Sequence, residues 1–191
     1  MQTIDEIIED CKYPIREFHT YKFGAKNGCK KVIIETFKKI DKTFNKFEWL
    51  SEYDEITEWM IDTKGKGLAL FGSVGRGKTV INTFILPILF RYAYKKVIIC
   101  KTATELTRQT IESKWALSID DIGTENIVND YGTKIDIITE AINHAEHKSK
   151  LLFLTSNLTE KELINRYGLR TLDRIKRLCK IVIFTGKSLR T

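Results

Sequence analysis

The sequence lacks the features that would place the chain in a membrane or outside the cell. Across its 191 residues, no apolar run approaches the roughly 20 residues that a membrane-spanning helix requires. The first six residues include two acids and form no apolar signal core, which argues against secretion. The four cysteines are scattered without a C-x-x-C pair, which favours free thiols in a reducing compartment. We therefore expect a cytoplasmic protein that does not bind a membrane.

An excess of one charge is also missing from the first third of the chain. Residues 1–66 carry 12 basic and 13 acidic side chains, so they do not form a basic DNA-binding arm. The basic excess lies at the other end, where residues 161–191 contain nine Lys or Arg and two acids. Their balance of +7 equals the net charge of the chain. Such a patch suits nucleic acid, an acidic partner or a neighbouring subunit's nucleotide, or it is only a solvated helix face.

The composition is typical of a globular fold, with 42% hydrophobic and 30% charged residues. Residues 13–30 contain turn-forming glycines and asparagine and are expected to be a loop. We expect residues 1–60 to be a helical segment that packs on or docks to the core, and residues 61–191 to form that core. Apolar residues at helical spacing predict three helices in the first segment, over 1–12, 31–46 and 47–60.

From residue 67 onward, short apolar runs alternate with helical patterns. Such runs, without internal polar alternation, are typical of parallel strands that are buried on both faces of a sheet. The sequence therefore predicts an α/β fold with a five-stranded parallel sheet flanked by helices. The expected strands are 67–71, 96–100, 115–119, 151–155 and 180–184. The expected helices are 78–93, kinked at Pro87, and 104–113, 134–147, 159–166 and 171–178.

The first expected strand leads into a glycine-rich motif. The motif is Gly72-Ser73-Val74-Gly75-Arg76-Gly77-Lys78-Thr79 and fits G-x-x-x-x-G-K-[ST], the phosphate-binding P-loop. Its glycines let the backbone curl so that successive N–H groups point at phosphates, at the start of a helix that favours anions. Lys78 can reach the β- and γ-phosphates, and the Thr79 hydroxyl can hold Mg²⁺. We expect these eight residues to bind a nucleoside triphosphate.

Polar side chains follow two of the other strands. Asp120 and Asp121 come directly after the strand over 115–119, where we expect Asp120 to hold Mg²⁺ and Asp121 to polarise an attacking water. Asn157 follows the strand over 151–155, and its amide can bind the γ-phosphate or that water. It can equally cap the next helix, so the residues alone leave both interpretations open. All three lie where ligands bind, at the carboxyl ends of parallel strands.

Four segments carry a resemblance to a known group of proteins. They occur in the order 72–79, 117–125, 155–158, and Arg166-Tyr167-Gly168 with Asp173-Arg174. Together they resemble the AAA+ ATPases of the DnaC-like helicase-loader group, to which the transposition helper IstB is related. The resemblance covers about residues 60–191. It implies an AAA+ P-loop fold, ATP and Mg²⁺ as cofactors, self-association through the nucleotide site, and a role in placing a replicative helicase on DNA.

The resemblance also implies roles for single residues. Lys78 and Thr79 match the Walker A pair, Asp120 the Mg²⁺ carboxylate and Asn157 the sensor 1 residue. Asp121 stands where many AAA+ proteins have glutamate, and its shorter side chain predicts slow hydrolysis. Arg174 matches the arginine finger, which stabilises charge on the γ-phosphate of the adjoining subunit.

Two features near the end of the chain qualify the resemblance. Arg170 and Arg177 lie one helical turn on either side of Arg174, so they are alternatives for the finger. Residues 186–191 leave almost no room for a helical lid, so we expect a minimal or absent lid, with Arg190 as the only late candidate for a sensor 2 arginine.

The leading hypothesis is an ATPase with weak hydrolysis that loads a replicative helicase on single-stranded DNA. DNA replication of a phage or mobile element would suit so compact a chain. The alternative from another class is a nucleotide-gated adaptor such as an IstB-like transposition helper. A small-molecule P-loop kinase is disfavoured because the sequence has no arginine-rich mobile lid or obvious acceptor pocket.

Overall fold

The computed structural model describes residues 3, 4, 6, 19–40, 47–125, 128–130 and 133–189. The helix expected over 1–12 lies almost wholly outside these residues, and Arg190 lies outside them as well. No helix in the described ranges is long and apolar enough to cross a membrane.

Five parallel strands form the central sheet, as the apolar runs predicted. Their order is β2-β3-β6-β1-β7, so the strand that leads into the P-loop lies between two strands from later in the chain. Leu68 of β1 pairs with Phe153 on one side and Lys180 on the other. The strands are β1 (Gly67–Gly72), β2 (Cys100–Thr102), β3 (Ala116–Asp120), β6 (Leu151–Ser156) and β7 (Cys179–Phe184).

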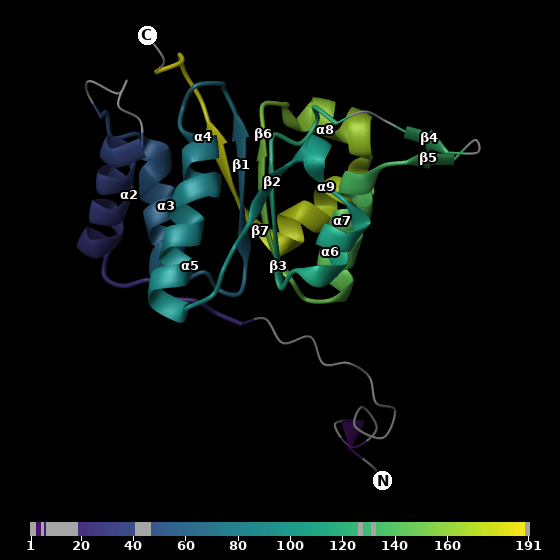
Figure 1. Cartoon of the computed structure of the whole chain (residues 1–191), viewed down its shortest axis with the longest axis horizontal. Helices are drawn as coiled ribbons and strands as arrows, with labels where there is room; N and C mark the ends of the chain where they lie inside the picture. Colours follow the sequence, from purple (N-terminus) through teal and green to yellow (C-terminus); the bar gives the residue numbers. More distant parts are fainter. Residues whose placement is uncertain are drawn as a thin grey trace.

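Helices cover both faces of this sheet (Figure 1). Leu68 and Leu70 of β1 point into a core with α2, α3 and α5, whereas Ala69 and Phe71 point into a core with α6, α7, α8 and α9. The helices are α2 (Lys26–Ile40), α3 (Ser51–Ile61), α4 (Lys78–Val80), a π-helix (Ile81–Ile85), α5 (Leu86–Tyr94), a 3₁₀ turn (Ala103–Glu105), α6 (Arg108–Ser113), α7 (Ile137–His147), α8 (Glu160–Tyr167) and α9 (Leu169–Leu178).

Helix α2 begins at Lys26, inside the loop expected over 13–30. The expectation rested on Asn27 and Gly28, but tertiary packing outweighs their weak helix propensity. Cys29 is 1% exposed and lies one turn before Ile33 and two turns before Phe37, which makes a single buried face. The loop prediction was therefore wrong for residues 26–30.

The second strand was expected over 96–100, but only its end pairs with the sheet. Cys100 pairs with Ser118 of β3, and the residues before it form no ladder. The Trp115 indole N–H donates to the Val97 carbonyl at 2.8 Å, which takes the place of a strand partner. Val97 and Ile99 are consequently half exposed at this edge of the sheet.

The helical segment that precedes Pro87 has a wider turn than an α-helix. A π-helix spans Ile81–Ile85, and the Leu86 N–H donates to the Ile81 carbonyl five residues back. This wider turn relieves the clash that proline makes with the carbonyl four residues earlier.

Two further segments differ from the expectation. The helix expected over 104–113 is divided into a 3₁₀ turn and α6, because Thr107 caps α6 by accepting from the Thr110 N–H. The segment before α7 forms a hairpin that the sequence analysis did not predict. Its strands are β4 (Val128–Asp130) and β5 (Thr133–Ile135), and Figure 1 shows it extending beyond α7 and α8, away from the central sheet.

Candidate functional site

The P-loop connects the end of β1 to the start of α4. Gly72, Gly75 and Gly77 have φ angles of +107°, +74° and +86°, which lie in the left-handed region that favours glycine. A Cβ on Gly77 would also lie 2.6 Å from the Phe37 ring and 2.9 Å from the Tyr53 oxygen. Glycine is therefore required at position 77 by both the backbone angle and the packing behind it.

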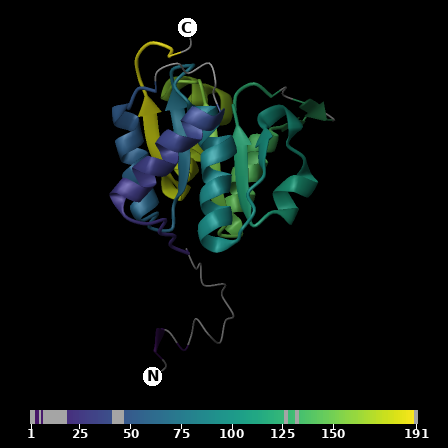
Figure 2. The same cartoon turned by 60° about the vertical axis from the view of Figure 1, so that its left-hand side comes forward.

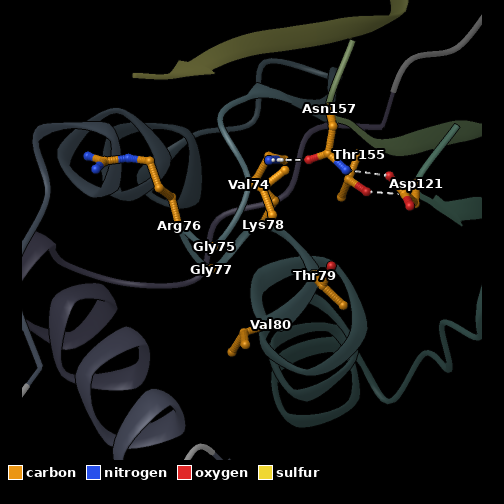
Figure 3. A pocket seen from close by; sticks show the side chains of 10 residues that line it. All are labelled: Val74, Gly75, Arg76, Gly77, Lys78, Thr79, Val80, Asp121, Thr155 and Asn157. Carbon is orange, nitrogen blue, oxygen red and sulfur yellow. Dashed lines mark hydrogen bonds between the residues drawn. The ribbon is translucent and has the colours of Figure 1, made fainter. Parts of the chain in front are cut away.

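A cavity of about 270 Å³ lies in front of this loop (Figure 3). Six of the eight predicted P-loop residues, 74–79, line it, together with Val80, Asp121, Thr155 and Asn157. The other two, Gly72 and Ser73, present their carbonyls to the Lys78 ammonium at 2.8 and 2.7 Å. The cavity thus combines a curled backbone, one buried cation and polar groups from two strand ends.

Three side chains form a hydrogen-bonded chain along one wall of the cavity. The Lys78 ammonium donates to Asn157 Oδ1 at 2.9 Å, and Asn157 Nδ2 donates to Asp121 Oδ1 at 2.8 Å (Figure 3). The cap of α8 is Thr159, whose hydroxyl accepts from the Glu162 N–H. Of the two interpretations of Asn157, the structure therefore places its amide in the cavity.

The two aspartates have different environments. Asp120 is 8% exposed, and its carboxylate accepts from the Thr155 hydroxyl at 2.7 Å. The same hydroxyl accepts from the Asp121 N–H at 2.7 Å, while Asp121 takes a left-handed φ of +58° and reaches the cavity. Thr155, to which the sequence analysis gave no role, therefore joins both aspartates. The sequence feature that could have identified Thr155 is its place as a polar residue at the end of an apolar strand.

The oxygen atoms near the P-loop fit a hydrated Mg²⁺. Thr79 is exposed and lines the cavity, and Asp120 is the last residue of β3, which β6 separates from β1. Mg²⁺ is usually held by one or two carboxylates together with phosphate oxygens and water, and not by a cage of protein ligands. The described part of the chain contains no group of three or more His, Cys, Asp or Glu side chains able to hold a metal.

The environment of the Asp121 carboxyl predicts how ATP hydrolysis depends on pH. Burial raises its pKa above the ordinary value, and the negative charge of Asp120 raises it further, against the opposing effect of Lys78. If the Asp121 carboxylate activates water, kcat/KM for ATP will fall on the acid side with a midpoint above the ordinary aspartate value of about 3.9, because kcat/KM reports the pKa of the free protein. We expect this limb in kcat/KM measured from about pH 4 to pH 8. An undiminished kcat/KM at about pH 4 in a folded protein would contradict this role.

Arg174 lies outside the cavity, on α9. Its Nε donates to Glu146 Oε2 of α7 at 2.8 Å, and its Nη1 donates to Asn143 Oδ1. Arg177 forms an ion pair with the same Glu146 carboxylate. Arg170 is exposed and forms no ion pair with any residue in the described ranges. The structure therefore separates the three finger candidates into two that bind Glu146 within the chain and one that does not.

Ion pairs also neutralise part of the C-terminal basic patch. Besides the two arginines on Glu146, Arg166 pairs with Glu125 at 2.9 Å and Lys176 pairs with Glu160 at 2.6 Å. Of the eight basic residues that the structure describes in 161–189, four thus have acidic partners. The charge available to an external partner is smaller than the sequence alone indicates.

Comparison with known proteins adds to this geometry. No known family model matches the chain, and no curated protein is similar to it in sequence. The crystal structure of the DnaC helicase loader superposes with a TM-score of 0.57 at 17% identity, covering 73% of this chain and 94% of that one. This chain has the fold of the DnaC helicase loader. The DnaC-like AAA+ resemblance is thereby confirmed at the level of the fold.

Two other solved structures are similar to this DnaC-type fold. One is a candidate primosome component from Streptococcus pyogenes serotype M3, with a TM-score of 0.45 and 15% identity over 87% of this chain and 84% of that one. The other is DnaI, with a TM-score of 0.40 and 19% identity over 81% of this chain and 85% of that one. TM-scores below 0.5 are too low to add to the fold assignment.

The DnaC-type core also holds one P-loop side chain in an unexpected place. Arg76 lies within the motif, but its guanidinium points away from Lys78 and from the cavity (Figure 3). It forms a buried ion pair with Glu52 of α3, with Arg76 Nη2 3.1 Å from Glu52 Oε1. No local pattern in the sequence predicted this contact, because the two residues are 24 positions apart.

Proposed function

We propose that this chain binds ATP with Mg²⁺ between the P-loop and the ends of β3 and β6. The convergence of Lys78, Asn157 and Asp121 on one P-loop cavity supports this proposal most directly. The backbone N–H groups and Lys78 bind the phosphates, while Thr79 and Asp120 hold Mg²⁺. When bound there, Mg²⁺ would supply positive charge that offsets the negative charge of the phosphates.

We propose slow hydrolysis that depends on self-association. Asp121 accepts a hydrogen bond from the attacking water, and Asn157 orients that water or the γ-phosphate. Among the residues that the structure describes, the one arginine that lines the cavity is Arg76, whose side chain is directed away. A neighbouring subunit supplies the missing cation, for which Arg174 is our first choice and Arg170 and Arg177 are the alternatives.

We propose that the ATPase acts as a helicase loader in DNA replication of a phage or mobile element. The fold likeness to the DnaC helicase loader supports this role. Residues 61–191 would be the ATPase domain and residues 1–60 the segment that docks a partner. The replicative helicase and single-stranded DNA are the proposed partners, and the unpaired part of the C-terminal basic patch is the proposed DNA contact.

A nucleotide-gated adaptor is the second candidate. Two observations favour it: the short Asp121 in place of glutamate, and the ion pair that holds Arg174 on Glu146 within its own chain. Such an adaptor would bind its partner when ATP is present and would not need turnover.

A loading experiment tests the proposed function. The replicative helicase of the source cell is incubated with this chain, ATP and circular single-stranded DNA. The DNA is circular so that the helicase cannot thread onto it from an end. We expect this chain to increase helicase on the circles several-fold, and Asp121→Asn to reduce repeated loading. Partner binding with ATP, without loading and unaffected by Asp121→Asn, would support the adaptor and contradict the loader. No ATP-dependent effect on either partner would contradict both.

A further inference from the structure

Two side chains of helix α3 bind the P-loop residue Arg76. The Arg76 and Glu52 side chains are 10% and 6% exposed, so their ion pair is largely withdrawn from water. The adjacent residue of α3, Tyr53, donates its hydroxyl to the Arg76 carbonyl at 3.1 Å. Two neighbouring side chains of one helix therefore hold the guanidinium and the backbone of the same P-loop residue. Neither contact faces the phosphate cavity.

The C-terminal segment joins the same contact. The Thr185 N–H donates to Glu52 Oε1 at 3.0 Å, so this one oxygen binds both the P-loop and the segment that follows β7. Arg76 Nη1 donates to the Lys187 carbonyl at 3.0 Å, and the Leu189 N–H donates to the Gly75 carbonyl at 3.0 Å. Figure 2 shows α3 next to the yellow β7 and the chain end that continues from it.

Folding stability alone does not explain the buried ion pair between Glu52 and Arg76 well. Burial would raise the pKa of the Glu52 carboxyl, but its own N–H, the Thr185 N–H and Arg76 together hold it below the ordinary value, so Glu52 is charged near neutral pH. Arg76 Nε is buried without a hydrogen-bond partner among the described residues. Buried ion pairs are often no more stable than apolar side chains of similar size, and a buried donor without a partner is unfavourable. The geometry that the pair imposes on the P-loop is a better explanation.

We propose that Glu52 and Tyr53 are positioning residues of the nucleotide site. They fix the P-loop backbone at Arg76 in the shape that presents its N–H groups to phosphates. Helix α3 and residues 185–189 are therefore energetically coupled to nucleotide affinity, although neither lines the cavity. A partner that displaces α3 would weaken nucleotide binding without contacting the nucleotide. This inference rests on the proposed ATP binding at the P-loop.

A double-mutant cycle on nucleotide affinity tests this coupling. The dissociation constant of ATP·Mg²⁺ is measured for the full chain and for Glu52→Gln, Arg76→Gln and the double variant. We expect each single change to weaken binding roughly tenfold, because a hydrogen bond to a charged group is lost. The double variant should bind about as well as either single variant, and not about a hundredfold more weakly than the wild type.

Two further variants make the test specific. Tyr53→Phe keeps the ring and removes one hydroxyl, so we expect a loss of affinity of a few-fold, on the order of one neutral hydrogen bond. Glu58→Gln is the matched control, because Glu58 lies on the same helix and its ion pair with Lys26 is exposed. We expect the control to bind ATP as the wild type does. Denaturant unfolding of each variant separates affinity from stability.

The outcomes distinguish this inference from the proposed function. Wild-type affinity in all folded variants, with only their stability reduced, would overturn the positioning role and leave the proposed function intact. Losses that multiply in the double variant would overturn the coupling. If Glu52→Gln does not fold, Tyr53→Phe decides alone: wild-type affinity in that folded variant would overturn the positioning role. A wild-type chain that does not bind ATP would overturn the proposed function and this inference with it.

Discussion

The Lys78→Ala variant is expected to lose at least about a hundredfold in affinity for ATP·Mg²⁺. The Lys78 ammonium is 2.7–2.9 Å from three oxygens, the carbonyls of Gly72 and Ser73 and the side-chain amide oxygen of Asn157. Among the described residues it is the one lysine that lines the cavity, so its loss removes the main side-chain charge that the phosphates can bind. Isothermal titration with ATP, in the presence of Mg²⁺, measures the effect.

The control for Lys78→Ala is the same substitution at a lysine outside the site. Lys161 is exposed on α8, and Lys161→Ala should bind ATP with unchanged affinity. Circular dichroism and thermal unfolding show whether Lys78→Ala keeps its fold, since this side chain is buried and hydrogen-bonded. A folded Lys78→Ala protein with wild-type affinity would contradict the assignment of the P-loop.

The Arg174→Ala variant should keep its ATP affinity and lose about a thousandfold or more in turnover. An arginine supplied by a neighbouring subunit stabilises charge in the transition state, and removal of such a finger costs on the order of 10³ to 10⁵ in rate. Because the proposed site of action lies on another subunit, the loss should disappear when Arg174→Ala is mixed with a subunit that supplies the finger but cannot bind ATP, such as Lys78→Ala. The steady-state ATPase rate of the mixture measures this rescue.

The contacts of Arg174 define the controls for this prediction. Its ion pair with Glu146 is structural, so Glu146→Gln should destabilise the α7–α9 contact without the same loss of turnover. Arg170→Ala and Arg177→Ala should retain turnover if Arg174 is the finger. The finger would have to be reassigned to Arg170 if only Arg170→Ala lost turnover. Equal losses for Glu146→Gln and Arg174→Ala, without rescue by mixing, would contradict a role on the neighbouring subunit.

The central part of the fold could be predicted because it is encoded locally. The strand expected over 151–155 is observed as Leu151–Ser156, and the strand expected over 180–184 as Cys179–Phe184. Each contains a short apolar run, which sequence patterns identify well, although only β6 is buried along its whole length and Ile183 of the edge strand β7 is half exposed. The meeting of Asp121 and Asn157 at one edge also follows from sequence, because parallel strands bring their carboxyl ends together. The roles of these two residues remain predictions.

The remaining features depend on contacts between distant residues. The Val97 carbonyl binds a side chain, Trp115, in place of a strand, so hydropathy overestimated the length of the second strand. The buried face of α2 is completed by other elements, so the turn-forming residues at its start were misleading. The contact between Glu52 and Arg76 joins helix α3 to a motif residue whose side chain points away from the cavity. Neither propensity nor periodicity reports such pairs.

The ATPase rate per subunit, measured against protein concentration with and without single-stranded DNA, tests the central claim most directly. If a neighbouring subunit completes the site, the rate per subunit will rise with concentration as assemblies form, and the Arg174→Ala protein will not show this rise. A rate that stays flat with concentration, or that is absent despite tight ATP binding, would contradict a self-assembling ATPase and favour the nucleotide-gated adaptor.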